Sequence, residues 1–364
     1  MLVDIIAGAR PNFMKISPII KSIKLAQSNG KNIHFRLIHT GQHYDKNMSD
    51  NFFEQLQIPE PHFNLNVGSG SQAQQTAGIM IKYEEILEKE KSDLCLVVGD
   101  VNSTMACSIV AKKMNIKVAH VEGGIRSGDS TMPEEINRMV TDSISDFFFT
   151  TSEIANENLK NEGIAKSKIY FVGNTMIDTL LANTTNFFPP EIYTTLPLHK
   201  KKYIVLTLHR PSNVDEESLF DTLIQNLITF SSQIPIVFPA HPRTKKIIEK
   251  LNFSFNNLFV IDPLSYFEFN FLVQNSMAVI TDSGGVTEET TVLNIPCITL
   301  RNSTERPETC SIGTNVLVGS DIDQLKIAFE NLHSGIWKAG SIPPLWDGKA
   351  SERIVNYLIE IFNL

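Results

Sequence analysis

The chain has 364 residues, of which 42% are hydrophobic and 20% are charged, a balance that is ordinary for a globular protein. A single hydrophobic core stops growing at roughly 250–300 residues, so this length predicts two domains. The net charge of −8, from 40 acidic and 32 basic residues, argues against a nucleic-acid partner, since such proteins carry a basic surface.

The cysteines and the hydropathy of the sequence predict the cellular setting of the protein. The four cysteines show no C-x-x-C spacing and most lie in apolar runs, so we expect reduced thiols and a cytoplasmic setting. They are Cys95, Cys107, Cys297 and Cys310. A strand pattern opens the chain at residues 2–7, and no apolar run reaches about 20 residues. We therefore expect no signal peptide, no transmembrane helix and no membrane partner.

The first half of the chain alternates predicted strands with predicted helices. Short apolar runs that end in glycine or polar turns predict strands at 2–7, 35–39, 94–98, 118–121, 146–150 and 169–172. Amphipathic stretches predict helices at 13–27, 47–56, 72–90, 104–114, 137–145 and 153–162. Strand, turn and helix in this order are typical of a parallel α/β sheet, and we assign the first domain to residues 1–182.

The second half repeats this pattern after a change in composition. Prolines and a lysine run predict a linker at 183–202, followed by a second domain at 203–345. Predicted strands lie at 203–208, 236–239, 259–261, 278–281 and 297–300, with a predicted helix at 218–232. The tail, 346–364, contains a helix pattern with an apolar face. We therefore expect two Rossmann-like, doubly wound parallel-sheet domains with a ligand cleft between them, because ligands bind at the carboxyl ends of parallel strands.

Carboxylates gather after two consecutive strands of the first half. The stretch 120–138 holds Glu122, Asp129, Glu134 and Glu135. Asp100 follows the preceding strand. Neighbouring carboxylates drive each other's pKa values apart and so provide an acid and a base, which predicts catalysis by Asp100, Glu122 and Glu134. Helix capping explains Asp100 and Glu134 equally well, and we interpret Glu135 as a helix-start residue.

A glycine turn in the second half has the features of a phosphate site. Ser283, Gly284 and Gly285 join a strand to a helix, and backbone N–H groups at a helix N-terminus bind diphosphates. A plain tight turn is the alternative. Glu288 or Glu289, one turn into the helix, could bond ribose hydroxyls.

Basic side chains at other strand ends extend this prediction. Arg10 and Lys15, after the first strand, could hold phosphates. Arg126 and Arg138 could do the same or pair with nearby carboxylates. His209 also follows a strand, where it could be a general acid, a phosphate contact or a structural residue.

Missing motifs exclude the common cofactors. The sequence has no G-x-G-x-x-G fingerprint, which argues against nicotinamide and flavin dinucleotides. It has no H-E-x-x-H motif and no close Cys/His grouping, which argues against a catalytic metal. We therefore expect no cofactor.

Taken together, these motifs resemble those of non-hydrolysing UDP-N-acetylglucosamine 2-epimerases over nearly the whole chain and in the right order. The segments that carry the resemblance are 8–11, 99–100, 120–127, 133–138, 208–210, 282–289 and 304–308. The resemblance implies a glycosyltransferase-B-like fold whose C-terminal helix packs back on the first domain. It also implies a cytoplasmic homodimer that interconverts UDP-GlcNAc and UDP-ManNAc without metal or nicotinamide, for cell-surface polysaccharide synthesis.

The family mechanism is elimination followed by re-addition. UDP and the C2 proton leave to give 2-acetamidoglucal, and UDP then adds back while C2 is protonated from the other face. The motif match implies that the catalytic residues are Asp100, Glu122, Glu134 and His209, with the assignment of base and acid open. The implied UDP-binding residues are Arg10, Lys15, Ser283, Gly284, Gly285 and Glu289.

Some bacterial members of the family bind a second UDP-GlcNAc as an activator. Residues that resemble parts of that allosteric site are Gln42, His43, Arg210 and His241. The loop at 67–75 differs from its usual form in those members, so the sequence leaves allosteric activation open.

The first loop departs from the usual family pattern. It reads Gly-Ala-Arg-Pro-Asn at 8–12 in place of Gly-Thr-Arg-Pro-Glu, and similar openings occur in relatives that epimerise UDP-2,3-diacetamido-glucuronate. That substrate is therefore one alternative, and a hydrolysing epimerase that releases ManNAc and UDP is another. A retaining glycosyltransferase and a non-catalytic UDP-sugar sensor are the hypotheses from other classes.

Overall fold

The computed structural model describes residues 1–41, 53–250 and 256–364. The chain divides into two compact units, and each is described here by itself. Unit 1 comprises Met1–Ala182 and Pro344–Leu364, and unit 2 comprises Asn183–Pro343.

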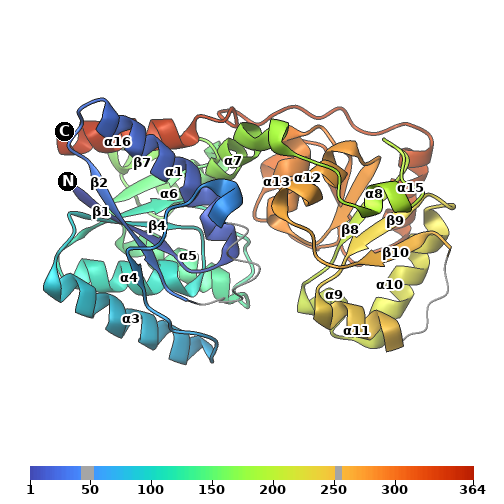
Figure 1. The fold of residues 1–364 in the computed structure, drawn as a ribbon, viewed down its shortest axis with the longest axis horizontal. Coiled ribbons are helices and arrows are strands. Elements are labelled where there is room, and N and C mark those ends of the chain that lie inside the picture. The colour runs from blue at the N-terminus through green and yellow to red at the C-terminus, as the bar shows by residue number, and fades with distance from the viewer. Residues whose placement is uncertain (42–52, 251–255) are drawn as a thin grey trace. The chain divides into compact units, whose positions relative to one another are not determined.

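Unit 1 is built on a seven-stranded parallel sheet in the order β3-β2-β1-β4-β5-β6-β7 (Figure 1). Its strands are β1 (Leu2–Ala7), β2 (His34–His39), β3 (Phe63–Asn64), β4 (Leu94–Val98), β5 (Lys117–Val121), β6 (Phe147–Thr150) and β7 (Ile169–Phe171). β1 and β4 are buried almost throughout, which explains why their sequences read as continuous apolar runs.

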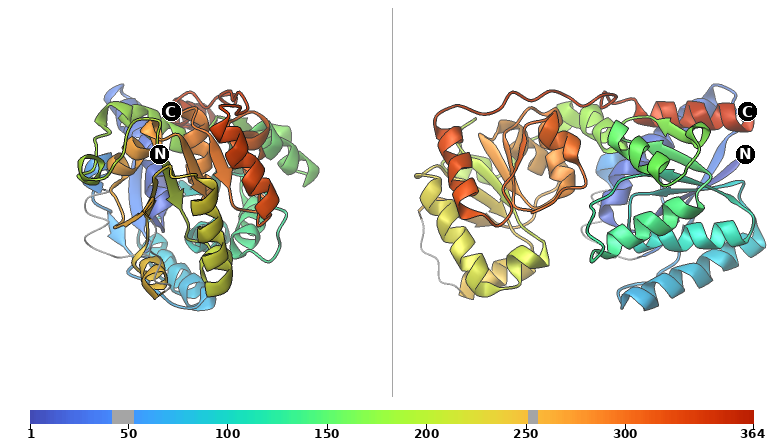
Figure 2. Two further views of the ribbon diagram at one scale, coloured as in Figure 1. Left: turned by 90° about the vertical axis from the view of Figure 1, so that its right-hand side faces the viewer. Right: turned by 180° about the vertical axis from the view of Figure 1, so that it is seen from behind.

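Helices connect the strands of unit 1 and cover both faces of its sheet. They are α1 (Arg10–Ser28), α3 (Gln72–Lys89), α4 (Asn102–Lys113), α5 (Pro133–Ile144), α6 (Glu153–Asn161), α7 (Thr175–Asn183) and α16 (Ala350–Phe362), with a 3-10 turn at Lys166–Lys168. α3, α4 and α5 pack side by side, and α16 lies beside α1 (Figures 1 and 2). Part of the helix expected at 47–56 lies outside the described residues.

The C-terminal segment returns to unit 1 through buried contacts. Asp178 accepts hydrogen bonds from the backbone N–H groups of Ala350 (3.0 Å) and Ser351 (2.7 Å), the first residues of α16. The indole of Trp346 is buried and donates to the carbonyl of Thr151 (2.9 Å). A carboxylate at a helix N-terminus satisfies exposed N–H groups and the helix dipole, so α16 is an integral part of unit 1.

Unit 2 has a six-stranded parallel sheet in the order β10-β9-β8-β11-β12-β13. The strands are β8 (Ile204–Thr207), β9 (Ile236–Pro239), β10 (Leu258–Ile261), β11 (Ala278–Thr281), β12 (Cys297–Thr299) and β13 (Asn315–Leu317). The helices are α8 (Ile192–Thr195), α9 (Pro211–Val214), α10 (Glu217–Phe230), α11 (Pro242–Lys250), α12 (Tyr266–Asn275), α13 (Gly284–Val292), α14 (Pro307–Ser311) and α15 (Ile322–His333), with a 3-10 turn at Thr184–Asn186.

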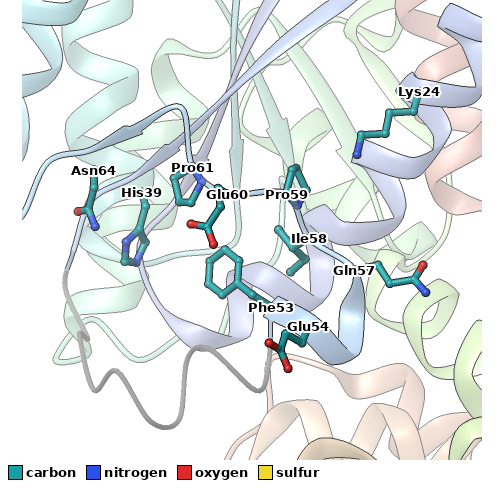
Figure 3. A pocket seen from close by; sticks show the side chains of 10 residues that line it. All are labelled: Lys24, His39, Phe53, Glu54, Gln57, Ile58, Pro59, Glu60, Pro61 and Asn64. Atoms are coloured by element: carbon teal, nitrogen blue, oxygen red, sulfur yellow. The ribbon is translucent and has the colours of Figure 1, made fainter.

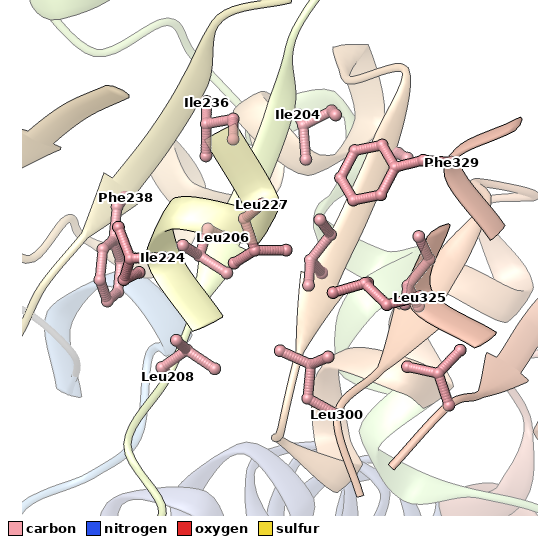
Figure 4. Close-up of a cluster of buried hydrophobic side chains, with 14 of the residues drawn as sticks. Ile204, Leu206, Leu208, Ile224, Leu227, Ile236, Phe238, Leu300, Leu325 and Phe329 are labelled. Carbon is pink, nitrogen blue, oxygen red and sulfur yellow. The ribbon is translucent and has the colours of Figure 1, made fainter. Parts of the chain in front are cut away.

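One hydrophobic cluster of unit 2 lies between its sheet and two helices. Figure 4 shows side chains of β8 and β9 meeting those of α10 and α15, among them Leu206, Phe238, Leu227 and Phe329. All four are almost fully buried. The part of the chain expected as a linker, 183–202, belongs to unit 2 and packs Leu198 into a second cluster.

The predicted fold class is confirmed, because both sheets are parallel and each has helices in its strand connections. α12 and α15 are among the helices that were not predicted from the sequence. Within the described ranges, no helix is both long and apolar enough to cross a membrane.

Candidate active site

The predicted site residues follow strands at or beside the points where strand order reverses. In unit 1 that point lies between β1 and β4, which pair in parallel, and in unit 2 it lies between β8 and β11. Connections leave such neighbouring strands toward opposite faces, so a crevice forms at their carboxyl ends. Each unit therefore places one group of candidate residues at the ligand-binding edge of its own sheet.

Glu122 follows β5 and forms an ion pair with Lys15 of α1. The distance from Lys15 Nζ to Glu122 Oε2 is 2.8 Å, and the exposed fractions of the two side chains are 11% and 3%. The backbone of Glu122 has φ 72°, in the left-handed region, and its N–H donates to the carbonyl of Phe149 (2.9 Å). A buried carboxylate beside an ammonium group stays ionised in a nearly dry environment, which suits a general base.

The turn after β4 is shaped to admit this ion pair. Gly99 has φ +71°, and a Cβ there would lie 3.5 Å from Lys15 Nζ and 3.8 Å from Glu122 Oε2. Asn12 braces the same turn by donating from Nδ2 to the carbonyl of Val98 (2.9 Å). Glycine at residue 99 thus allows the required backbone conformation and leaves room above the charged pair.

Asp100 is held by a chain of charged groups that continues into α5. Arg138 donates to Asp100 Oδ2 (2.5 Å) and to Glu135 Oε2 (2.6 Å). The Glu135 carboxylate also accepts the backbone N–H groups of Ser127 and Gly128. Burial raises the pKa of Glu135, but these hydrogen bonds and Arg138 outweigh it and leave the pKa lowered. Glu135 therefore fastens the loop before α5, beyond the helix-start role expected from sequence.

The other two carboxylates of the stretch differ from each other. Glu134 lies in the first turn of α5, half-buried, and its side chain makes no hydrogen bond or ion pair with any residue the structure describes. Asp129 Oδ1 accepts the N–H (3.0 Å) and the hydroxyl (2.6 Å) of Thr131, as expected of a turn residue. Of these two carboxylates, Glu134 is the one that remains available for chemistry.

A buried histidine network in unit 1 joins β5, α5 and the turn after β4. His120 Nδ1 lies 2.6 Å from Asp142 Oδ1, and its Nε2 lies 2.8 Å from the carbonyl oxygen of Gly99. Arg126 also pairs with Asp142 (2.7 Å) and with Glu162. The sequence gives no local signal for this network, because β5 and α5 meet only in the folded unit.

In unit 2, His209 and Asp282 follow the neighbouring strands β8 and β11. His209 Nδ1 lies 2.7 Å from Asp282 Oδ1, with the histidine side chain 59% exposed and the aspartate fully buried. Asp282 also accepts the backbone N–H of Arg210 (2.9 Å) and a hydrogen bond from Asn213 Nδ2 (3.0 Å). His209 was among the predicted catalytic residues, whereas Asp282 had only been placed after its strand, with no role.

The glycine turn begins α13, with Ser283 as its N-cap residue. A Cβ on Gly284 would lie 3.5 Å from Glu305 Oε1 and 3.8 Å from Arg301 Nη1. Arg301 pairs with Glu305 (2.5 Å), and Arg210 Nη2 lies 3.8 Å from the same carboxylate. The guanidinium groups of Arg210 and Arg301 therefore lie at the helix N-terminus together with the Glu305 carboxylate that they face. Helix N–H groups and guanidinium groups are donors that suit a diphosphate.

Glutamates of the same helix are buried and partnered. Glu289 accepts a hydrogen bond from Tyr266 Oη (2.8 Å), and burial raises the pKa of Glu289 to about 7. Glu288 forms an ion pair with Arg306, and both side chains are almost fully buried. Arg301 and Arg306 were not among the predicted site residues, although both lie in or next to the Thr304–Glu308 motif.

Several predicted residues lie outside what the structure describes. Arg10 begins α1, but its side chain is not described, and Gln42 and His43 lie outside the described residues. Arg210 and His241 follow β8 and β9 of unit 2, and His241 is exposed. The allosteric role of Gln42, His43, Arg210 and His241 and the UDP-binding role of Arg10 stay predictions.

Unit 1 also contains a cavity of about 610 Å³ near the end of β2 (Figure 3). It is lined by Lys24, His39, Phe53, Glu54, Gln57, Ile58, Pro59, Glu60, Pro61 and Asn64. These residues include none of the predicted catalytic or UDP-binding residues, so the cavity is separate from the candidate site. Over the described ranges, no three His, Cys, Asp or Glu side chains form a group that could hold a metal ion.

Comparison with known proteins gives consistent matches over the whole chain. The family model for UDP-N-acetylglucosamine 2-epimerase matches residues 25–359. The UDP-N-acetylglucosamine 2-epimerase of Methanocaldococcus jannaschii is 42% identical over 98% of this chain and 99% of its own. The UDP-2,3-diacetamido-2,3-dideoxy-D-glucuronate 2-epimerase of Pseudomonas aeruginosa is 39% identical, with the same coverage.

A solved structure extends the similarity to the fold. The crystal structure of the M. jannaschii enzyme in complex with UDP-GlcNAc and UDP matches with a TM-score of 0.88 and 41% identity, over 99% of this chain and 100% of the other. The predicted glycosyltransferase-B-like fold class is thereby confirmed.

Proposed function

This chain belongs to the UDP-N-acetylglucosamine 2-epimerase family, and from that premise we propose that it is an isomerase that interconverts UDP-GlcNAc and UDP-ManNAc. The substrate loses UDP and its C2 proton to give 2-acetamidoglucal. UDP then adds back to C1 while C2 is protonated on the opposite face.

The observation that carries the proposal is the buried ion pair at the end of β5. The C2 proton is only weakly acidic, so its removal needs an ionised, poorly solvated base and a leaving group that departs readily. Glu122 meets the first need, since it is 3% exposed and 2.8 Å from the Lys15 ammonium. A diphosphate bound at the glycine turn of unit 2 meets the second.

Within this proposal the remaining candidates divide between the two units. Asp100 and Glu134, with Glu122, supply the acid and base for the two faces of C2. Lys15 and Arg10 add positive charge on the side of unit 1. His209 assists departure of UDP, while Ser283, Gly284, Gly285 and Glu289 bind the nucleotide. We propose that units 1 and 2 are the two domains expected from the sequence.

An exchange experiment tests the proposed reaction. The enzyme is incubated with UDP-GlcNAc in deuterated water and followed by NMR. Deuterium at C2 together with UDP-ManNAc is the expected result. Free ManNAc with UDP would instead indicate a hydrolysing epimerase, and the absence of C2 exchange would exclude both epimerase readings and favour a glycosyltransferase or a sensor.

A second substrate has a specific observation in its favour. The P. aeruginosa relative named for UDP-2,3-diacetamido-2,3-dideoxy-D-glucuronate is 39% identical to this chain, close to the 42% of the M. jannaschii UDP-GlcNAc enzyme. The reaction at C2 is the same for both sugars. Parallel exchange assays with the two nucleotides decide between them, and the substrate with the higher kcat/KM is the physiological class.

The proposal includes a cytoplasmic homodimer that needs no cofactor. Light scattering of the full chain should give twice the mass of 40.8 kDa. Activity in the presence of EDTA and without added nicotinamide should equal that of the untreated enzyme. Loss of activity in EDTA would contradict the metal-free mechanism.

A further inference from the structure

Asp282 directly follows β11 in unit 2, next to the residues that follow β8. β8 and β11 are parallel neighbours with Thr207 opposite Thr281, so the residues just after them emerge side by side. This places the His209 imidazole against the Asp282 carboxylate, with 2.7 Å between Nδ1 and Oδ1. The aspartate is fully buried, whereas the histidine side chain is 59% exposed.

The hydrogen bonds of Asp282 fix its charge and its orientation. Oδ2 accepts the backbone N–H groups of His209 (3.1 Å) and Arg210 (2.9 Å) and the Nδ2 of Asn213 (3.0 Å). Burial raises the pKa of Asp282, but the hydrogen bonds from His209, Arg210 and Asn213 outweigh it and leave the pKa lowered. An ionised carboxylate is an acceptor only, so the proton of a neutral His209 must sit on Nδ1.

A buried histidine–aspartate pair in unit 1 shows, by comparison, what is distinctive about His209 and Asp282. His120 and Asp142 are 2.6 Å apart, but His120 is completely buried and its Nε2 is bound to the carbonyl oxygen of Gly99. Both of its ring nitrogens are therefore used within the fold. His209 has the same carboxylate contact through Nδ1 but belongs to an exposed side chain, so its Nε2 is available to a ligand.

We propose that Asp282 is the positioning residue for His209, holding the proton on Nδ1 and presenting Nε2 to the departing diphosphate. This inference rests on the proposed function. When the C1–O bond breaks, its electron pair stays on the diphosphate oxygen and a unit 1 carboxylate takes the C2 proton. The protonated His209 donates from Nε2 to that oxygen, and Asp282 balances the imidazolium charge. Re-addition of UDP reverses the cleavage of the C1–O bond, with His209 giving up its hydrogen bond to the diphosphate oxygen, while a second unit 1 carboxylate delivers a proton to the opposite face of C2.

Asp282→Asn provides a sharp test, because the amide can satisfy only one arrangement. Three donors face the Oδ2 position, so the amide oxygen must lie there and the NH₂ must face His209 Nδ1. The amide then donates to Nδ1 and moves the imidazole proton to Nε2. We expect ¹⁵N NMR of the histidine-labelled full chain to show the proton on Nδ1 in the wild type and on Nε2 in the variant.

Asp282→Asn removes the negative charge that balances the His209 imidazolium, so we expect slower turnover. We expect kcat of Asp282→Asn to fall on the order of 10²-fold, within the range for general acid catalysis, while KM for the UDP-sugar changes less than about 3-fold. In a His209→Asn background, Asp282→Asn should cause little further loss, because two residues that act as one unit are not additive. Asn213→Ala, which removes another partner of the same carboxylate, should keep the wild-type tautomer.

An unchanged His209 tautomer in Asp282→Asn would overturn the proposal. So would a full additional loss of kcat when Asp282→Asn is added to His209→Asn. The third such result is an Asn213→Ala variant that shows both the tautomer change and the loss of kcat. If Asp282→Asn does not fold, a wild-type His209 with its proton on Nε2 also overturns it. A wild type that fails to exchange the C2 proton refutes the proposed function instead, and the NMR result still decides the role of Asp282.

Discussion

At the scale of single residues, Glu122 combines backbone strain with a buried charge. A left-handed conformation costs a residue with a side chain about 1–2 kcal/mol, and Glu122 adopts it at φ 72°. The hydrogen bond from its N–H to Phe149 and the ion pair with Lys15 hold it there. Strain of this kind persists only where the surroundings impose it, and it concentrates at functional sites.

The variant Glu122→Gln tests the role of this charge. Glutamine keeps the shape and an acceptor for Lys15 but cannot accept the C2 proton. We expect C2 exchange to fall by about 10²–10⁴-fold, while UDP affinity stays close to that of the wild type. The melting temperature should fall, because the buried Lys15 ammonium group loses its counter-ion. Glu162→Gln, which removes an ion-pair partner of Arg126 at the surface of the same unit, is the matched control. Loss of UDP binding in Glu122→Gln would identify Glu122 as a structural residue.

The raised pKa of Glu289 predicts how the stability of the protein depends on pH. Burial raises its pKa from 4.5 to about 7, so in this pH window the folded protein binds a proton that the unfolded chain has released. Stability should therefore fall as the pH rises from 4.5 to 7, by about 3 kcal/mol in total from this group.

The check compares the denaturant unfolding of wild type and Glu289→Gln at pH 5 and pH 8. Glutamine accepts the Tyr266 hydrogen bond but does not ionise, so the variant should lose this part of the pH dependence. Glu330→Gln, at an exposed position of α15, should keep it. An equal pH dependence in wild type and Glu289→Gln would contradict the prediction.

At the scale of elements, α16 depends on contacts at its first turn. Asp178 accepts the N–H groups of Ala350 and Ser351 from a buried position, whereas Asp347 pairs with Arg353 nearer the surface. Removing a buried cap leaves N–H groups without acceptors, which costs about 1–2 kcal/mol, while exposed ion pairs contribute roughly 0–1 kcal/mol.

The two aspartates therefore form a matched pair for mutagenesis. Asp178→Ala should lower the melting temperature by several degrees and speed hydrogen exchange in α16. Asp347→Ala should have a clearly smaller effect on both. Equal effects of the two variants would show that the buried cap does not hold the helix.

The helices and strands also show which sequence patterns were sufficient to predict secondary structure. Apolar runs ending in polar turns located most strands within a residue or two, because buried parallel strands have that pattern. α12 was missed although Ser265 and Glu268 form a capping box before it. Its apolar composition hides the helical period. α15 begins similarly at Asp321, whose side chain caps two backbone N–H groups.

At the scale of the whole molecule, the important pairs join distant parts of the chain. Lys15 and Glu122 are 107 residues apart, and His209 and Asp282 are 73 apart. The sequence could place Glu122, His209 and Asp282 at strand ends and Lys15 in the first helix, and the family resemblance could suggest roles for all but Asp282. Which carboxylate meets which cation depends on strand order, a property of the folded sheet that no local pattern contains.

The last prediction follows from the proposal that unit 1 transfers protons while unit 2 binds the nucleotide. Gly284 lies at the start of α13 in unit 2, the unit proposed to bind the nucleotide. A Cβ there would make ordinary contacts of 3.5 Å with Glu305 Oε1 and 3.8 Å with Arg301 Nη1. Gly284→Ala should therefore fold, and Gly284→Val adds two further carbons at the same place. We expect the added carbons of both variants to occupy the space proposed for a diphosphate above the helix N–H groups.

The expected result is a graded loss of UDP affinity, about 10-fold for alanine and more for valine, measured by calorimetry with UDP alone. Glu122→Gln should show the opposite pattern, with UDP bound and C2 exchange lost. The two sets of variants together separate nucleotide binding from proton transfer. If Gly284→Val binds UDP as tightly as the wild type, the diphosphate does not lie at the start of α13, and the anion site must be sought elsewhere on unit 2.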